Sequence, residues 1–243
     1  MSEQSAVLLH QVKKAFPLHG GRALEVLDLE HLALSIGSCT VLRGRSGSGK
    51  TTLLNLIAGV TAPSAGTIRV GGTDVFALSE ARRDRFRAEN VGYVFQTFNL
   101  VAALSAIENV ILAMMFADVV PQREQRRRAG DLLTRLGLSE RVAHKPAQLS
   151  RGEQQRVAIA RAVAKQPDLL LCDEPTGALD QETGRVVLSA LLRVNEELGR
   201  TTLLITHNAV IAALGDRVLR FADGRVASES HNSRRARPEE LSW

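Results

Sequence analysis

The sequence is poor in cysteine and in aromatic residues. Its 243 residues include 2 cysteines, 1 tryptophan, 1 tyrosine and 7 phenylalanines. Cys39 and Cys172 lie far apart, each within an apolar run. They therefore predict buried, reduced thiols of a cytoplasmic protein, and they argue against a disulfide framework or a cysteine-rich metal site.

The sequence also lacks a hydrophobic run long enough to cross a membrane. Its most apolar stretch, LVAALSAIENVILAMMFADVV, is interrupted by Glu108, Asn109 and Asp118, whereas a membrane span needs about 20 predominantly apolar residues. The first residues, MSEQSAVLLHQVKK, do not show the basic and then apolar pattern of a secretory signal. Any membrane contact is therefore expected to come through a partner chain.

Charge is only slightly unbalanced. Lys and Arg number 31 against 26 Asp and Glu, which leaves a net charge of +5. Such an excess favours nucleotides, nucleic acid or anionic lipid as partners. Much of it lies in three arginine-rich segments, and such segments usually form solvated surface or loose tails. These segments span residues 82–87, 123–128 and 234–237.

Short β-branched runs alternate with helical patterns along the chain, which predicts an α/β fold with a largely parallel sheet. The expected strands are 7–10, 32–36, 40–43, 67–70, 91–95, 169–172, 202–205 and 218–221. The expected helices are 50–58, 105–116, 124–136, 152–165, 182–198 and 209–214. Only helical patterns occur between Gln96 and Gln148, which predicts a helical lobe inserted into the sheet domain. The polar sequence after Gly224 predicts a loose tail.

A phosphate-binding loop is the strongest local signal. The segment LRGRSGSGKTTLLNLIAG has the spacing G-x-x-x-x-G-K-[ST] between an apolar strand and a helix, as this loop requires. The glycines let the backbone N–H groups face the phosphates, Lys50 reaches the β- and γ-phosphates, and the Thr51 hydroxyl ligates Mg²⁺. The candidate nucleotide-binding residues here are Gly44, Ser46, Gly47, Ser48, Gly49, Lys50, Thr51 and Thr52.

Two adjacent carboxylates supply the second half of a phosphoryl-transfer site. The apolar strand in LLLCDEP ends at Asp173, which is expected to hold the magnesium shell in place, and Glu174 is expected to accept a proton from the attacking water. Adjacent acids at a strand end also occur as simple helix N-cap residues. The phosphate-binding loop upstream favours the catalytic interpretation.

The segment AQLSRGEQQRVAIARA admits two interpretations. Ser150, followed three residues later by Glu153, matches a capping box at the start of an amphipathic helix. A helix N-terminus also attracts anions, so the same segment could form one wall of a phosphate site. The segment by itself does not decide between the two.

Six motifs in a fixed order carry a family resemblance. They are GRSGSGKTT, VFQTFNL, LSRGEQQRVAIARA, LLLCDEP, GALD and LITH. From about residue 6 to residue 227 the chain resembles the nucleotide-binding subunit of ABC (ATP-binding cassette) transporters. The resemblance implies a P-loop NTPase sheet core with an antiparallel β portion and a helical subdomain inserted at about residues 97–165. It implies an ATPase domain over residues 1–227, with 228–243 as a polar tail, and it implies ATP and Mg²⁺ as ligands.

The resemblance also implies roles for single residues. Gln96 would contact Mg²⁺ or the attacking water, and His207 would hold the γ-phosphate, so Lys50, Gln96, Glu174 and His207 form the expected catalytic set. Phe16 would stack on adenine, although a lone phenylalanine near a strand is also a common core residue.

Three further residues would act between subunits. Ser150 and the backbone N–H of Gly152 would face the γ-phosphate bound to a second subunit. Asp180 in GALD would meet that subunit, although an ordinary N-cap explains Asp180 equally well. Arg151 and Glu153 depart from the commonest family pattern, L-S-G-G-Q, but the glycine next to the phosphate is retained.

The amino-acid sequences of the motifs are most similar to those of the macrolide-efflux, lipoprotein-release and cell-division ATPases. That resemblance implies a homodimer around two ATP molecules that drives integral-membrane permease subunits from the cytoplasmic face of the cell membrane, with no nucleic-acid partner. The ATPases of importers for polar solutes such as amino acids share much of these motif sequences. A soluble ABC-type ATPase without a permease is a further alternative. A P-loop kinase or GTPase would lack the signature segment and the switch histidine.

The apolar stretch SAIENVILAMMF leaves two possibilities open. Apolar residues recur in it at helical spacing, which is typical of a core helix. Part of the same stripe, with Phe98 and Leu100, would alternatively line an apolar groove for a helix of the membrane partner. The stripe consists of Ile107, Val110, Ile111, Met114 and Met115.

Overall fold

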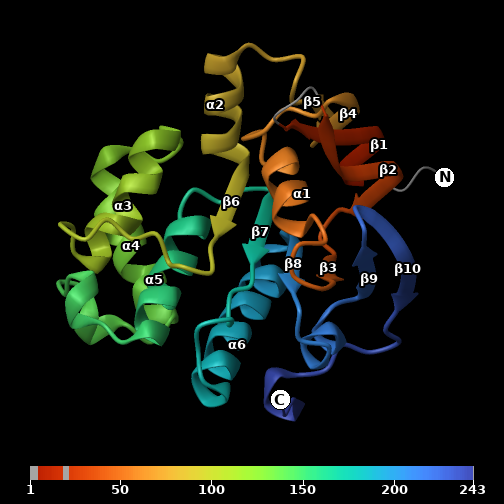
Figure 1. Cartoon of the computed structure of the whole chain (residues 1–243). Coiled ribbons are helices and arrows are strands. Elements are labelled where there is room, and N and C mark those ends of the chain that lie inside the picture. Colours follow the sequence, from red (N-terminus) through yellow and green to blue (C-terminus); the bar gives the residue numbers. More distant parts are fainter. Residues whose placement is uncertain (1–4, 19–21, 243) are drawn as a thin grey trace.

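The computed structural model describes residues 5–18 and 22–242, which form two β-sheets and an adjoining group of helices (Figure 1). The first sheet is antiparallel, with the order β2-β1-β4-β5. Its strands are β1 (Ser5–Pro17), β2 (Ala23–Ser35), β4 (Ala65–Val70) and β5 (Thr73–Asp74). This sheet is the antiparallel portion that the family resemblance implied.

The second sheet has the order β10-β9-β3-β8-β7-β6 and is parallel except for the pairing of β9 with β10. Its strands are β3 (Cys39–Arg43), β6 (Val91–Val94), β7 (Leu169–Asp173), β8 (Thr201–Thr206), β9 (Arg217–Ala222) and β10 (Arg225–His231). The α/β class and the largely parallel sheet are thereby confirmed.

Six α-helices surround the sheets in the described chain. They are α1 (Lys50–Ile57), α2 (Glu80–Asn90), α3 (Ala106–Ala117), α4 (Gln122–Arg135), α5 (Arg151–Val163) and α6 (Gln181–Leu198). Helices α3 and α4 lie between β6 and β7 in the sequence, and they stand beside the sheets at the left of Figure 1. The inserted helical region is therefore present, while the boundaries 97–165 and 1–227 stay predictions.

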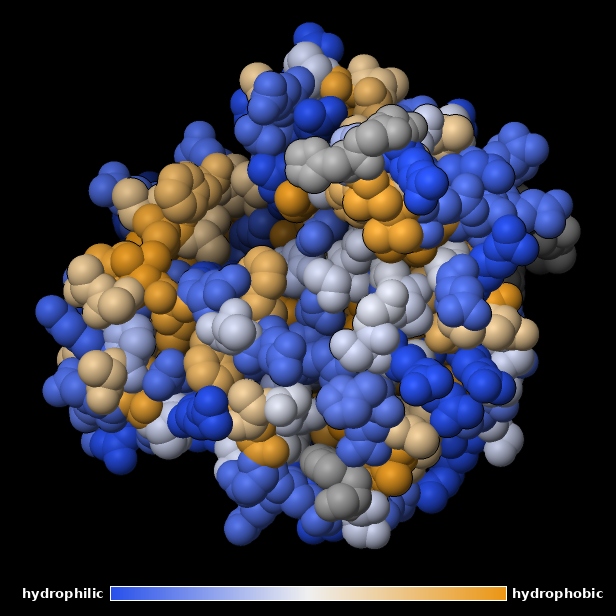
Figure 2. All heavy atoms as spheres, viewed as in Figure 1, coloured by the Kyte–Doolittle hydropathy of each residue, from blue (hydrophilic) through white to orange (hydrophobic). Residues whose placement is uncertain are grey.

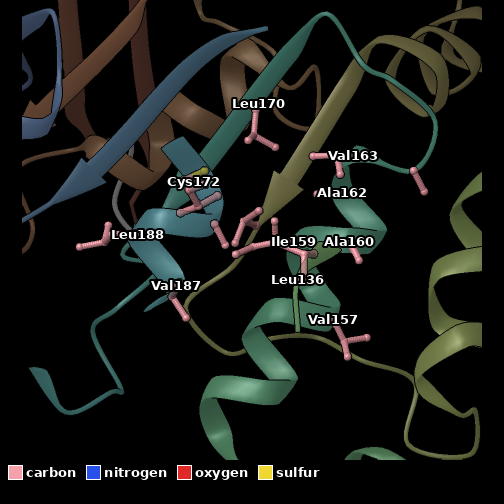
Figure 3. Close-up of a cluster of buried hydrophobic side chains, with 14 of the residues drawn as sticks. Leu136, Val157, Ile159, Ala160, Ala162, Val163, Leu170, Cys172, Val187 and Leu188 are labelled. Carbon is pink, nitrogen blue, oxygen red and sulfur yellow. The ribbon is translucent and has the colours of Figure 1, made fainter. Parts of the chain in front are cut away.

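Strand β7 separates two hydrophobic cores. Leu169 and Leu171 pack into the core that α1 and the antiparallel sheet cover, whereas Leu170 and Cys172 pack into the core formed with α3 to α6. Successive side chains of a strand point to opposite faces, so a continuous apolar run is what a strand buried on both faces requires. Figure 3 shows Leu170 and Cys172 close to labelled side chains of α5 and α6.

Both cysteines are free and buried, as the sequence predicted. Desolvation by burial raises the pKa of the Cys39 thiol to about 12 and raises that of Cys172 well above its ordinary value. Neither thiol is therefore ionised near neutral pH, and both behave as small apolar core residues.

The apolar stripe of α3 is mainly core. Ile107, Val110 and Met114 are buried against the rest of the helical region, so the groove interpretation is wrong for these three residues. Leu100 packs against the same core. The exposed apolar side chains of α3 are instead Met115 and Phe116, at 59% and 75% exposure.

The expectation of a loose tail is wrong for residues 225–242. Strand β10 pairs with β9, and the side chain of Leu241 is buried. The Arg235 guanidinium donates to both carboxylate oxygens of Asp216 and to Oδ1 of Asn195. The polar sequence of this segment did not predict that it packs on the domain. The segment is held mainly by ion pairs and backbone hydrogen bonds to distant residues, and such contacts leave no apolar periodicity in the sequence.

Other differences are local. Strand β2 begins at Ala23 rather than near residue 32, and the arginine-rich segment 82–87 lies within α2. The expected helix at 209–214 is a 3₁₀ turn, Val210–Leu214. In α2 no residue is buried, so an apolar periodicity could not reveal the helix.

Candidate functional site

The carboxyl ends of neighbouring parallel strands bring the sequence motifs together. The order β3-β8-β7-β6 places the phosphate-binding loop, His207, the acid pair and Gln96 along one edge, because each of these ends its strand or follows it within two residues. The register pairs Arg43 with Thr206 and Asp173 with Ile205. In open α/β sheets, ligands bind at this edge.

A cavity of about 540 Å³ lies at this edge. It contains residues of the loop, the acid pair, the glutamine and the histidine, although more than 150 residues separate the first from the last in the sequence. Its lining consists of Val26, Ser46, Gly47, Gly49, Lys50, Thr51, Thr52, Gln96, Asp173, Glu174 and His207.

The loop presents the N-terminus of α1 to this cavity. Gly49 is the N-cap residue at φ 98°, a left-handed conformation that glycine adopts without strain, and no side chain of the described ranges caps the helix. The first N–H groups of α1 are thus available to an anion.

Lys50 folds back over the loop. Its Nζ donates to the carbonyl oxygens of Gly44 and Arg45 at 2.8 and 2.7 Å, and the residue is only 7% exposed. Desolvation lowers the pKa of Lys50, while the carboxylates of Glu174 and Asp173 act in the opposite direction. The cation therefore sits beside the two acids, where a polyphosphate would place its own negative charge.

Two loop residues support the loop instead of lining the cavity. A Cβ at Gly44 would lie 2.3 Å from the carbonyl oxygen of Phe221, so the loop passes directly over β9. The hydroxyl of Ser48 is buried without a hydrogen-bond partner in the described part of the chain, and the Ser48 carbonyl accepts from Gly224 N.

The side chains of Thr51, Asp173 and Gln96 in the cavity fit a magnesium ion. The Thr51 hydroxyl donates to Asp173 Oδ2 at 3.0 Å, and Gln96 lines the same space. Desolvation raises the pKa of Asp173 despite the hydrogen bond from Thr51, so a cation beside this carboxylate would offset the cost of burying its charge. Hydroxyl, carboxylate and amide oxygens are the hard donors that Mg²⁺ prefers.

The side chains of Glu174 and His207 contact each other in the same cavity. Oε1 of Glu174 lies 2.9 Å from Nδ1 of His207, and the Glu174 side chain is only 14% exposed. Glu174 N donates to the carbonyl oxygen of Ile205 on β8, and the residue has a left-handed φ of 47°. Non-glycine residues in this conformation cost energy and cluster at functional sites.

Phe16 and Asp180 do not line the cavity. Phe16 is 39% exposed near the end of β1, with Lys14 Nζ 4.8 Å from its ring centroid. Asp180 caps α6, and its Oδ1 accepts from Thr183 N at 3.0 Å. Adenine stacking by Phe16 and contact of Asp180 with a second subunit stay predictions.

Ser150 and Gly152 also lie outside the cavity of their own chain. Ser150 is the N-cap of α5 in a capping box with Glu153, so the capping interpretation is confirmed. A Cβ at Gly152 would lie 2.2 Å from Cγ2 of Thr183 on α6, so a side chain there would require the Thr183 side chain to move. A role of either residue at the nucleotide of a second subunit stays a prediction.

Val26 lines the cavity and was not anticipated. It lies in the part of β2 that the sequence did not predict, and its carbonyl oxygen packs close to Gly49. Along this part of β2 the buried Leu27 and Leu29 alternate with less buried residues such as Val26. This alternation was the signal in the sequence that could have predicted the strand.

A phosphate-binding loop, an acid pair at the adjacent strand end and an inserted helical region together define a P-loop nucleotide-binding protein. Residues 27–177 match the family model described as ABC transporter. The chain belongs to the ABC transporter family, and it contains the ATP-binding cassette of that family.

Curated relatives give the same assignment. The chain is 44% identical over 223 residues to the macrolide export ATP-binding/permease protein MacB of Syntrophobacter fumaroxidans, covering 91% of this chain and 31% of that protein. It is 41% identical over 230 residues to the uncharacterized ABC transporter ATP-binding protein YbbA of Escherichia coli, covering 95% of this chain and all of that protein. The chain thus spans about a third of the length of the MacB proteins it matches.

Solved structures share the fold. The dimeric ATP-binding cassette MJ0796 bound to ADP and Pi superimposes with a TM-score of 0.85 at 37% identity, covering 93% of this chain and 98% of that one. The cbiO1 protein from Clostridium perfringens, part of the cbiONQ transporter complex, gives a TM-score of 0.82 at 26% identity, covering 98% and 90%.

Proposed function

We propose that this chain binds and hydrolyses ATP with Mg²⁺ and uses that cycle to drive a membrane permease of the macrolide-export type. The observation that carries the proposal is the convergence of Lys50, Glu174 and His207 in one cavity at the ends of three parallel strands. The alternative is the ATPase subunit of an ABC importer for polar solutes such as amino acids, and the MacB relatives favour the export-type partner.

The residues divide the chemistry among them. The N–H groups at the start of α1 and the ammonium of Lys50 bind the β- and γ-phosphates and stabilise the charge that builds up on them. The Glu174 carboxylate accepts the proton of the attacking water, and His207 orients that carboxylate and contacts the γ-phosphate. Thr51, Asp173 and Gln96 would hold the magnesium ion, which supplies charge neutralisation at the phosphates when bound.

A second copy of the chain completes each site in this proposal. Ser150 and the N-terminus of α5 have no nucleotide to contact in their own chain, because they lie outside its cavity. A homodimer in which each α5 faces the phosphates of the other subunit gives them one. The dimeric state of the MJ0796 cassette supports this arrangement.

The membrane partner is proposed to dock in a groove between α2, α3 and α5. The groove has a volume of about 710 Å³, and its lining combines the apolar side chains of Tyr93, Phe95, Leu112 and Phe116 with charged ones. The charged side chains are Asp84, Arg85, Arg87, Asp118, Arg161 and Lys165. Figure 2 shows apolar residues over α3 beside the hydrophilic surface of α2. A helix end on the cytoplasmic side of a permease that carries both apolar and charged side chains fits this lining. No helix in the described ranges, 5–18 and 22–242, is long and apolar enough to cross a bilayer.

Two measurements on the purified chain test the proposal. ATP hydrolysis is expected with Mg²⁺ and is expected to be abolished when EDTA removes the metal. Sedimentation velocity is expected to show a monomer without nucleotide and a dimer with ATP in EDTA, where hydrolysis is blocked. A chain that binds no ATP, or that hydrolyses it equally well in EDTA, would contradict the proposed reaction.

A further inference from the structure

Gln155 on α5 connects the two loops that carry Gln96 and Glu174. The residue is completely buried. Its Nε2 donates to the carbonyl oxygen of Phe95 at 3.2 Å and to that of Pro175 at 2.9 Å. Phe95 directly precedes Gln96, and Pro175 directly follows Glu174, so one amide group holds the backbone beside both site residues.

The two carbonyl acceptors define the orientation of this amide. The opposite orientation would place Oε1 against two carbonyl oxygens, which is repulsive, so the NH₂ group must face them. Oε1 then lies buried without a hydrogen-bond partner among the described residues. An unpaired buried acceptor is costly, and the two hydrogen bonds that Nε2 donates to the carbonyl oxygens of Phe95 and Pro175 offset part of that cost.

The two loops also touch directly. A Cβ at Gly177 would lie 2.9 Å from Nε2 of Gln96, and Gly177 N donates to the carbonyl oxygen of Glu174 at 3.0 Å. The Gln96 side chain therefore rests on the turn that begins at Glu174. Gln155 bonds to Pro175 within that turn and to Phe95 before Gln96, so one side chain joins the two loops.

A second side chain of α5 holds the far end of the Gln96 loop. Arg161 donates to the carbonyl oxygens of Asn99 and Phe98. Both of these residues have left-handed φ values, 49° and 58°, a conformation that needs support in non-glycine residues. The loop of Gln96 is thus attached to α5 on both sides.

We infer that Gln155 is a positioning residue for hydrolysis, holding Gln96 and the general base Glu174 at their working separation and linking both to the helix whose N-cap is Ser150. The inference rests on the proposed ATPase function. A shift of the order of 1 Å in a reacting group can cost about 10²-fold in rate, so loosening these two loops is expected to slow the chemical step and to leave nucleotide binding nearly unchanged.

The test is Gln155→Met, which removes both hydrogen bonds at similar volume, compared with Gln154→Met. Gln154 is the matched control, because among the described residues its Nε2 bonds to the carbonyl oxygen of Leu149, just before the helix, and not to either site loop. Gln155→Met is expected to lower kcat about tenfold or more, with the Kd for ATP within about twofold of wild type. Gln154→Met is expected to hydrolyse ATP at the wild-type rate.

A double-mutant cycle separates positioning from a general loss of structure. In a Gln96→Ala background, Gln155→Met is expected to cost much less than it costs alone, because residues that act as a unit are not additive. An unchanged kcat in Gln155→Met, an equal loss in Gln154→Met, a full additional loss in the Gln96→Ala background, or a parallel loss of ATP affinity would each overturn the inference.

Failure of the proposed ATPase function and failure of the positioning role of Gln155 give different results. If wild type hydrolyses ATP and Gln155→Met does so equally, the positioning role is wrong and the ATPase function stands. If wild type shows no Mg²⁺-dependent hydrolysis, the ATPase function is wrong and the positioning role falls with it.

Discussion

His207 and Glu174 leave adjacent parallel strands with Nδ1 and Oε1 2.9 Å apart. Their exposure differs strongly, because the histidine side chain is 64% exposed and that of the glutamate 14%. The acid is thus held in the cavity, while the imidazole stands at its mouth. This contact places the proposed base next to the residue that would contact the γ-phosphate.

Replacing Glu174 by glutamine tests the general base. Glu174→Gln keeps the shape of the side chain but cannot accept a proton, so turnover is expected to fall by about 10²–10⁴-fold with ATP binding retained. Single-turnover kinetics and calorimetric titration measure the two quantities. Near-normal hydrolysis by the purified variant would show that another group accepts the proton.

Lys50→Ala is expected to lose both ATP affinity and hydrolysis. The ammonium is held at the loop by two carbonyl oxygens, where it is proposed to contact phosphate charge in the bound complex and in the transition state. Lys13→Ala, on an exposed part of β1, serves as the control. Tight ATP binding by Lys50→Ala in calorimetry would contradict the assigned role.

Mixed dimers test whether α5 acts on the other subunit. If Lys50 of each chain faces Ser150 of its partner, a dimer of one Lys50→Ala chain and one Ser150→Arg chain contains one doubly damaged site and one intact site. Nucleotide occupancy is then expected at one site per dimer. Two half-damaged sites would show that each chain uses its own α5. Gly152 is less suitable for this test, because a Cβ there would displace the Thr183 side chain of the same chain.

The capping box of α5 predicts an acid-dependent loss of stability. The backbone N–H of Ser150 above all, and also Arg141, lower the pKa of Glu153 to about 2, against the ordinary 4.5. The folded pKa is below the unfolded one, so this stabilisation is complete above pH 4.5 and is lost as the pH falls toward 2.

Glu153→Gln is expected to lower the free energy of unfolding at pH 7 by about 1–2 kcal/mol, a value reduced for partial solvent access. The difference from wild type is expected to shrink between pH 4.5 and pH 3 in urea unfolding. Glu140→Gln, at an exposed position, is the control. An equal difference at both pH values would contradict the assignment.

The groove at α3 predicts a loss of coupling without a loss of folding. Phe116→Asp is expected to prevent assembly with the permease and to leave ATP binding and thermal stability unchanged, because Phe116 lines the groove and is exposed. Met115→Asp is the matched control, since Met115 is exposed next to it but does not line the groove.

Leu100→Asp is expected to unfold the helical region, because Leu100 packs against the core. Normal assembly of Phe116→Asp would place the permease elsewhere.

Local chemistry made much of the site predictable from the sequence. The loop from Gly44 to Thr52 and the acids Asp173 and Glu174 are close in sequence to the strands and helices that hold them, so spacing alone specified their geometry. The capping box of Ser150 and Glu153 was readable for the same reason, since its partners are three residues apart.

Only the tertiary structure decided which distant segments meet. The bonds from Gln155 to Phe95 and Pro175 join residues 60 and 20 positions away, and the Arg235 contact with Asp216 converts a polar tail into a docked segment. Polar side chains carry no periodic signal for such contacts, because each depends on one partner supplied by the packing of other elements. The sequence by itself determined the chemistry of each motif, and the stacking of parallel strands decided that those motifs form one site.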